Sequence, residues 1–170
     1  IPLIGIEPSA ILTFRDEYPD LAYDQNLVTA KALAKNAFLI DEFIANEITK
    51  GNIQKEAFTK NAKLIKLHGH CQQKAISSVA PTQAILSFPE NYKVEVIASG
   101  CCGMAGSFGY EKEHYDLSMQ IGELVLLPAV RSQLSDTIIA APGTSCRHQI
   151  KDGAQKIALH PVEILFEALV

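Results

Sequence analysis

The 170-residue chain has no tryptophan, few other aromatic residues and no long apolar segment. No apolar run approaches the ~18–20 residues that a membrane-spanning helix needs. Lysine and arginine number 15 against 19 acidic residues, so the net charge is -4 and there is no basic excess of the kind that binds nucleic acid. These absences predict a chain with no transmembrane segment and no nucleic-acid partner.

Targeting signals are also missing, which favours a cytoplasmic protein. The chain starts at Ile1 rather than at methionine, which indicates a processed chain or an excised piece. Its length is about that of one domain, and 48% hydrophobic with 20% charged residues is an ordinary globular composition. We therefore expect one folded domain over residues 1–170.

Short apolar runs alternate with helical stretches along the chain. The runs are rich in Ile, Val, Leu and Ala and lack polar alternation, which is typical of strands buried on both faces of a parallel sheet. They lie at 3–6, 64–67, 94–98, 137–141 and 157–159. Helical patterns occupy 25–49, closed by Gly51, and also 111–126 and 161–169. The sequence predicts a three-layer α/β domain, with a mainly parallel sheet of about five strands and helices on both faces.

The chain has only four cysteines, Cys71, Cys101, Cys102 and Cys146, which are too few for a disulfide scaffold. Each follows an apolar run, and ligand sites of parallel sheets collect at the carboxyl edge of the strands. We expect three strands to bring the four thiols together, where sulfur donors suit zinc or an iron–sulfur cluster. Two alternatives are that the cysteines are small buried apolar residues or that Cys101 and Cys102 form a reversible disulfide.

A glycine-rich loop surrounds the vicinal cysteines and reads GCCGMAGSFG over 100–109. Gly100, Gly103 and Gly106 permit close backbone approach, so that amide groups can donate hydrogen bonds to cluster sulfur. A phosphate cradle is the other interpretation, although neither G-x-G-x-x-G nor Gly-Lys-Ser/Thr is present.

Histidines and one arginine stand beside the cysteines. His68 and His70 precede Cys71, and we interpret them as caps of the next helix, with metal ligation or proton transfer as the alternatives. Arg147 is a candidate partner for an anionic cluster or a carboxylate, and His148 is a candidate substitute ligand. We expect His160, which precedes a proline, to mark the start of a helix.

The strings HGHC at 68–71 and CCG at 101–103, together with the segment around Cys146, resemble the cysteine-rich CCG domain. That domain occurs in a heterodisulfide reductase subunit, in glycolate oxidase iron–sulfur subunits and in related Fe–S oxidases. The longer strings at 6–21, 99–123 and 141–161 are similar to the C-terminal region of FAD-linked oxidases of the D-lactate dehydrogenase and glycolate oxidase type. The similarity covers nearly the whole chain.

This resemblance implies an electron-transfer module of a larger oxidoreductase that oxidises a 2-hydroxy acid, a module that is not catalytic by itself. It implies a cluster of the 4Fe-4S type bound by Cys71, Cys101, Cys102 and Cys146, with FAD only in the parent protein. The implied partners are flavin and ferredoxin-like domains and an acceptor such as a quinone or carrier, and the parent complex would sit peripherally at the inner membrane. The alternative is a zinc-bound or metal-free structural or docking domain.

The chain departs from the family pattern at two positions. The close relatives often have cysteine after Glu-Pro-Ser, where this chain has Ala10. The family often ends in Cys-x-x-Cys, where this chain has Gln149. A set of five cysteines is therefore not available, and four thiols remain.

Overall fold

The computed structural model describes residues 1–170 and has a four-stranded parallel sheet at its centre. The strand order is β4–β3–β5–β6, with bounds Tyr92–Val96, Lys63–Leu67, Ile138–Ala140 and Ala158–Leu159. Ile65 of β3 is in register with Val94 of β4 on one side and with Ile138 of β5 on the other. Because every neighbouring pair is parallel, the carboxyl ends of the four strands lie at one edge.

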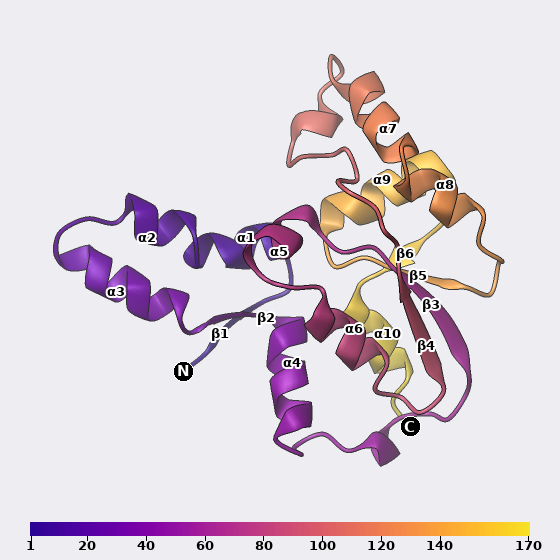
Figure 1. The fold of residues 1–170 in the computed structure, drawn as a ribbon, viewed down its shortest axis with the longest axis horizontal. Coiled ribbons are helices and arrows are strands. Elements are labelled where there is room, and N and C mark those ends of the chain that lie inside the picture. The colour runs from indigo at the N-terminus through magenta and orange to yellow at the C-terminus, as the bar shows by residue number, and fades with distance from the viewer.

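Helices cover both faces of this sheet (Figure 1). One face carries α4, α6 and α10, with bounds Ile40–Thr49, Ala80–Leu86 and Pro161–Glu167. The other face carries α7, α8 and α9, with bounds Tyr115–Glu123, Leu126–Arg131 and Thr144–Ala154. The consecutive residues Ile139 and Ala140 of β5 belong to different apolar cores, as the alternation of side chains along a strand requires. The predicted three-layer α/β class is confirmed.

The chain changes faces between the neighbouring strands β3 and β5. After β3 it runs through α5 (Cys71–Ile76) and α6 to β4, and after β5 it enters α9 on the opposite face. The loops that follow these two strands therefore diverge. A crevice forms outside the carboxyl ends of the strands at such a point in an open parallel sheet, and ligands bind there.

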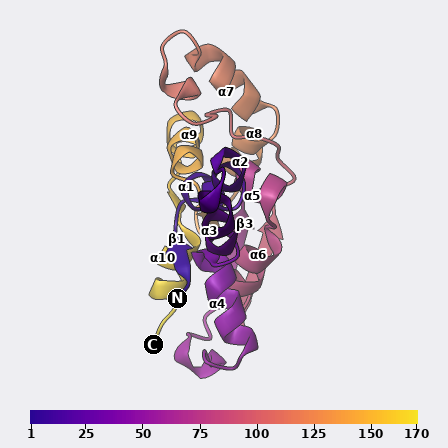
Figure 2. The ribbon, with the colours of Figure 1, turned by 90° about the vertical axis from the view of Figure 1, so that its left-hand side faces the viewer.

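A second, two-stranded parallel sheet holds the N-terminal segment. Its strands are β1 (Leu3–Gly5) and β2 (Ala37–Leu39). The connection between them contains α1 (Pro8–Ile11), α2 (Glu17–Leu21) and α3 (Gln25–Ala34). α2 and α3 extend away from the main sheet, at the left of Figure 1, and Figure 2 views them from their outer end.

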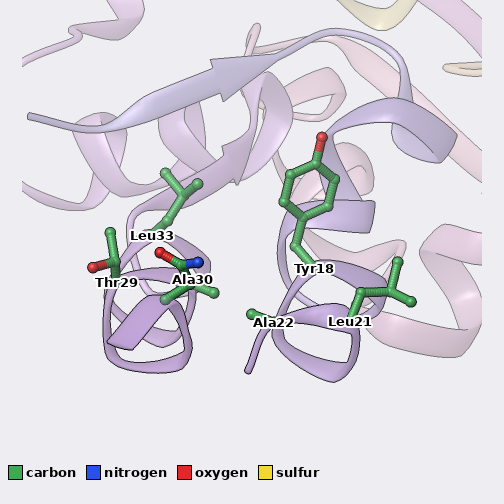
Figure 3. Close-up of a pocket in the computed structure, with 7 residues that line it drawn as sticks. Tyr18, Leu21, Ala22, Thr29, Ala30 and Leu33 are labelled. Carbon is green, nitrogen blue, oxygen red and sulfur yellow. The ribbon is translucent and has the colours of Figure 1, made fainter. Parts of the chain in front are cut away.

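The pair α2 and α3 has no buried residue of its own. A shallow apolar groove of about 350 Å³ lies between the two helices (Figure 3), and Tyr18, Leu21 and Leu33 are among the residues that line it. The small core nearby belongs instead to the neighbouring elements, where Leu12 and Leu39 are fully buried. This part of the chain is held by few apolar contacts compared with the two sides of the main sheet.

All five predicted strands occur, but the run at 3–6 pairs with β2 instead of joining the main sheet. The predicted continuous helix over 25–49 is wrong, because β2 interrupts it between α3 and α4. Ala37 and Leu39 are buried in the small core, and pairing with β1 gives their backbone the hydrogen bonds of a strand. Apolar residues at these positions fit either pattern, and the tertiary contact decides between them.

The other predicted helices are present with altered bounds. The helix expected over 111–126 begins only at Tyr115, so Glu111 and Glu113 lie in the turn before it. Gly51 follows α4 with a positive φ of 77°, and α10 begins at Pro161 as predicted. None of the helices combines the length and the apolar character that crossing a bilayer requires.

Candidate metal centre

The four cysteines lie at the carboxyl ends of three adjacent strands. Cys71 is the first residue of α5 after β3, Cys101 and Cys102 are in the loop after β4, and Cys146 is in the first turn of α9 after β5. The expectation that three strands of one sheet bring these residues to one edge is confirmed.

The four sulfur atoms form one connected group. Each lies close enough to the next to shift its pKa, from Cys71 to Cys101, from Cys101 to Cys102, and from Cys102 to Cys146. All four cysteines are free, without a disulfide. Sulfur atoms that are up to 75 residues apart in the chain therefore meet at a single place.

The four thiols divide into two with lowered and two with raised pKa values. The pKa of Cys101 is well below its usual range because Cys102 and then Cys71 donate to its sulfur. The pKa of Cys146 is lowered to about 5 by Cys102 and, against the opposing effect of burial, by His68. The pKa values of Cys71 and Cys102 are raised because their thiols donate to these acceptors. The lowered pKa values of Cys101 and Cys146 favour the thiolate form, which is the form that binds a cation.

The group runs from the interior to the surface. Cys102 and Cys146 are 3% and 1% exposed, Cys101 is half-buried and Cys71 is exposed. A cavity of about 270 Å³ opens beside them, lined by Ser9, His70, Cys71, Gln72, Cys102, Ala105, Gly106 and Ser145. Solvent and small molecules therefore reach one side of the sulfur group while its other side is sealed.

His68 lies with the two most buried sulfurs. One of its ring nitrogens and the sulfurs of Cys102 and Cys146 all lie within 4.8 Å of one another. The side chain is fully buried, Nδ1 is 2.7 Å from Ser99 Oγ, and Nε2 has no hydrogen-bond partner. The interpretation of His68 as a helix cap is wrong, because its ring points into the sulfur group. Its position immediately after the last residue of β3 was the sequence signal for this placement.

Three of the other four histidines, His70, His148 and His160, were candidates in the sequence and have structural contacts. His70 caps α5, and its Nδ1 accepts a hydrogen bond from the Gln72 amide at 3.2 Å. His160 caps α10 in the same way and also bonds the Ile6 carbonyl at 3.0 Å. His148 is hydrogen-bonded through Nδ1 to the Tyr110 hydroxyl and is not among the grouped donor atoms. The cap roles expected for His70 and His160 are confirmed.

Arg147 holds the loop that leads into α9. Its guanidinium donates to the carbonyls of Ala141 and Pro142 at 3.0 and 2.8 Å, and to Thr144 Oγ1 at 3.2 Å. These bonds fix the turn just before Cys146. The side chain therefore supports the site through the backbone.

The glycines of the loop at 100–109 differ in backbone conformation and in the space around them. Gly103 has a φ of 101°, and a Cβ there would lie 2.1 Å from the Ser118 carbonyl oxygen. Gly106 also has a positive φ, whereas Gly100 has neither a positive φ nor a close neighbour. The Gly103 amide donates to Cys101 Sγ at 3.3 Å, so an amide of this loop contacts a sulfur of the chain itself.

Lys74 is a site residue that the sequence analysis missed. Its ammonium group donates to the carbonyl oxygens of Ser99 and Gly100, both at 2.8 Å. The spacing of three residues from Cys71 places both on the same side of α5, and this spacing was the available signal. Lys74 brings a positive charge to the loop that carries Cys101 and ties α5 to this loop.

Ala10 and Gln149, which stand where the resemblance implies cysteine, have different surroundings. Gln149 is buried, and its amide donates to the Ser118 carbonyl and hydroxyl oxygens at 3.0 and 3.1 Å. Ala10 is exposed in α1, next to Ser9 at the cavity. Gln149 therefore supports the α7 side of the loop.

Comparison with known proteins finds relatives that align with nearly the whole chain. It is 29% identical over 99% of its length to D-2-hydroxyglutarate dehydrogenase of Escherichia coli K12, and 28% identical over 99% to the enzyme of that name from Haemophilus influenzae. It is also 26% identical over 99% of its length to a subunit of the anaerobic glycerol-3-phosphate dehydrogenase of Escherichia coli K12. The chain spans 16% of the length of the first two proteins and 41% of the third. No protein-family model matches the chain, and no solved structure is significantly similar to it.

Proposed function

We propose that this chain is an electron-transfer domain that holds an iron–sulfur cluster through Cys71, Cys101, Cys102 and Cys146. The observation that carries the proposal is the convergence of four free thiols from three adjacent strand ends at one edge of the sheet. Four cysteine thiolates are the usual ligands of a 4Fe-4S cluster, which supplies one-electron oxidation and reduction when bound.

Two further observations fit a bound iron–sulfur cluster. The ring nitrogen Nε2 of His68 is buried without a partner beside the sulfurs, whereas buried polar atoms are ordinarily satisfied. The amide of Gly103 already donates to Cys101 Sγ, and Lys74 places a positive charge at the same loop. Hydrogen bonds and charge of this kind stabilise an anionic centre and raise its reduction potential.

The partial burial of the sulfur group suits electron transfer. Cys102 and Cys146 are sealed inside, which excludes water from one side of the centre. Cys71 faces the surface, so an electron donor or acceptor can approach within a short distance of the centre. His148 is left out of the proposed ligand set because its Nδ1 is bonded to Tyr110.

The parent protein is part of the proposal. Relatives that align with nearly all of this chain carry the names of dehydrogenases, and the chain corresponds to a small fraction of their length. We therefore infer that the domain receives electrons from a flavin domain that oxidises a 2-hydroxy acid and passes them through further centres to a quinone or carrier. The domain itself contributes no catalytic residue.

Zinc is the second candidate, because a buried histidine and cysteines within 4.8 Å also suit a closed structural zinc site. A zinc site would hold the loops together without carrying electrons.

A redox titration separates the two functions. The chain is reconstituted anaerobically with iron and sulfide, reduced stepwise and reoxidised, and followed by visible absorption and electron paramagnetic resonance. We expect one reversible one-electron step, with a potential between about -700 and +450 mV. A reconstituted chain without a reversible redox step would contradict the proposal, and bound zinc would favour the structural alternative.

A further inference from the structure

We infer that His68 is a fifth protein donor to the proposed centre, in addition to the four cysteines, and binds through Nε2 next to Cys102 and Cys146. This inference rests on the proposed function, because it concerns the same group of sulfurs. Three donor atoms from these residues lie within 4.8 Å of one another, and all three side chains are buried. No residue outside the group offers Nε2 a hydrogen bond.

The hydrogen bonds around Ser99 determine which ring nitrogen is free. The Ser99 hydroxyl donates to the Ile97 carbonyl oxygen at 3.5 Å, so its lone pairs remain to accept a bond. His68 Nδ1 lies 2.7 Å from this oxygen, and a hydroxyl that donates to Ile97 requires Nδ1 to be the protonated nitrogen of the pair. In the neutral imidazole the other nitrogen, Nε2, then has a lone pair, which is the form that binds a metal.

A histidine bound to a metal usually donates its second ring N–H to a nearby acceptor, which fixes the tautomer and the orientation of the ring. The pair of His68 and Ser99 has this arrangement. Ser99 follows β4 and His68 follows β3, so the two strand ends hold the ring from both sides.

The backbone around His68 is held in the sheet. The His68 amide donates to the Ala140 carbonyl of β5 at 2.9 Å. At the next residue, Gly69, a Cβ would lie 2.4 Å from Val79 Cγ2, so the chain passes α6 with no spare room. A ligand on such a rigid base keeps its position with little loss of entropy.

The alternative is that Nε2 carries the proton and donates it to the Cys146 thiolate. In that case the ring would influence the centre without binding it. The Ser99 hydroxyl would then have to donate to Nδ1 and give up its bond to the Ile97 carbonyl oxygen. The two arrangements differ in whether a nitrogen nucleus is directly bonded to the metal.

The test is pulsed electron paramagnetic resonance of the reduced, iron-loaded chain, grown with histidine labelled with ¹⁵N in the ring. We expect a hyperfine coupling to nitrogen of the size given by a directly bound imidazole. This coupling should change from the pattern of ¹⁴N to that of ¹⁵N when the histidine is labelled. The coupling should vanish in His68→Gln and remain in His148→Gln, the matched control on the histidine bonded to Tyr110.

The outcomes for the two proposals can be told apart. A reversible iron–sulfur centre with only the weak couplings of amide or hydrogen-bonded nitrogen would overturn ligation by His68 and leave the proposed function standing. This comparison needs only the labelled wild-type chain, so it holds even if His68→Gln does not fold. If the chain holds zinc in place of iron, the proposed function fails. X-ray absorption at the zinc edge then tests whether the imidazole of His68 binds the zinc. A spectrum without scattering from imidazole would overturn the inference.

Discussion

Cys102 occupies the middle of the sulfur group, where its thiol contacts both Cys101 and Cys146. Replacing it with serine removes a soft sulfur ligand and leaves a side chain of nearly the same size. We expect Cys102→Ser to lose most of the bound iron after reconstitution while its far-ultraviolet circular dichroism stays that of the wild type. Ser145→Ala is the matched control, because it removes a hydroxyl from the same cavity, and its iron content should be unchanged. Equal iron in Cys102→Ser and wild type would exclude Cys102 as a ligand.

Gly143 shows how closely the backbone approaches the site. A Cβ at this position would lie 2.3 Å from His70 Cδ2 and 3.3 Å from Cys146 Sγ. The His70 ring is buried and caps α5, so it has little freedom to move away. We expect Gly143→Ala to lower the free energy of unfolding by about 1–3 kcal/mol through overpacking.

The matched control for Gly143→Ala is Gly100→Ala, because Gly100 has open space where the Cβ would stand and no positive φ. Urea unfolding of both variants measures the difference. Equal stability of the two variants would mean that the contact with His70 relaxes without cost.

The sequence predicted some residues of the site and missed others. The cysteines were found because each follows a strand, and the sheet edge brings strand ends together whatever the sequence distance between them. His68 was assigned to the wrong role, since a histidine before a helix fits a cap as well as a ligand. Only the direction of its side chain, which depends on the path of the loop past α6, distinguishes the two. Lys74 was missed because its acceptors are backbone carbonyl oxygens, which carry no sequence pattern.

At the scale of elements, α9 is joined to the N-terminal segment by a carboxylate. Glu7 Oε2 accepts a hydrogen bond from the Thr144 amide at 2.8 Å, at the first turn of the helix that carries Cys146. Burial raises the pKa of Glu7, but the hydrogen bonds from Thr144 and Ser9 outweigh it and leave the pKa below its usual value. A negative charge at a helix N-terminus is stabilising.

We expect Glu7→Gln to cost about 0.5–1 kcal/mol of unfolding free energy at pH 7. Because the pKa is lower in the folded state, the charge stabilises the fold above the unfolded value of about 4.3. This contribution disappears as the pH falls through the folded pKa. Urea unfolding should therefore show a larger difference between variant and wild type at pH 7 than at pH 3. An equal difference at both pH values would contradict the role of the charge.

The elements themselves were predicted best where the local pattern and the tertiary contacts agree. The central strand β5 is buried between two helical layers, with Ile139 and Ala140 in different cores, whereas the edge strand β4 is partly exposed and is held by its pairing with β3. The helix over 25–49 failed at 37–39, where the contact with β1 lies more than 30 residues away in sequence. No local pattern contains that contact.

At the scale of the whole molecule, the proposed centre links loops that are far apart in the chain. Cys71, Cys101 and Cys146 follow three different strands, so a bound cluster restrains the unfolded chain and adds binding energy to the folded state. If the restraint resembles that of a disulfide, it is worth about 2–4 kcal/mol. Anaerobic removal of iron by a chelator should then lower the Tm by roughly 5–15 °C.

The control for this experiment is Cys102→Ser, which should hold little iron and should not respond to the chelator. Thermal unfolding by circular dichroism measures both proteins with and without chelator. An equal fall in both would show that the chelator acts elsewhere in the molecule.

The overall architecture was within reach of the sequence, because buried parallel strands and helical spacing are local patterns. The helical pattern over 25–49 included α3, but the projection of α2 and α3 from the main sheet was not predicted, since apolar residues there remain exposed; Leu21 of α2 is 75% exposed and Tyr23, between the two helices, is 74% exposed. A pattern of apolar residues predicts which side chains are buried within the chain. The apolar side chains of this segment lie on the surface, so the pattern does not predict where the segment lies.

The most direct test of the account is the iron and acid-labile sulfide content of the chain after anaerobic reconstitution, measured beside zinc. The account predicts about four iron atoms and about four sulfides per chain, with zinc absent, as a cluster held by four cysteines contains. A chain that keeps one zinc without sulfide, or that keeps no metal, would contradict it.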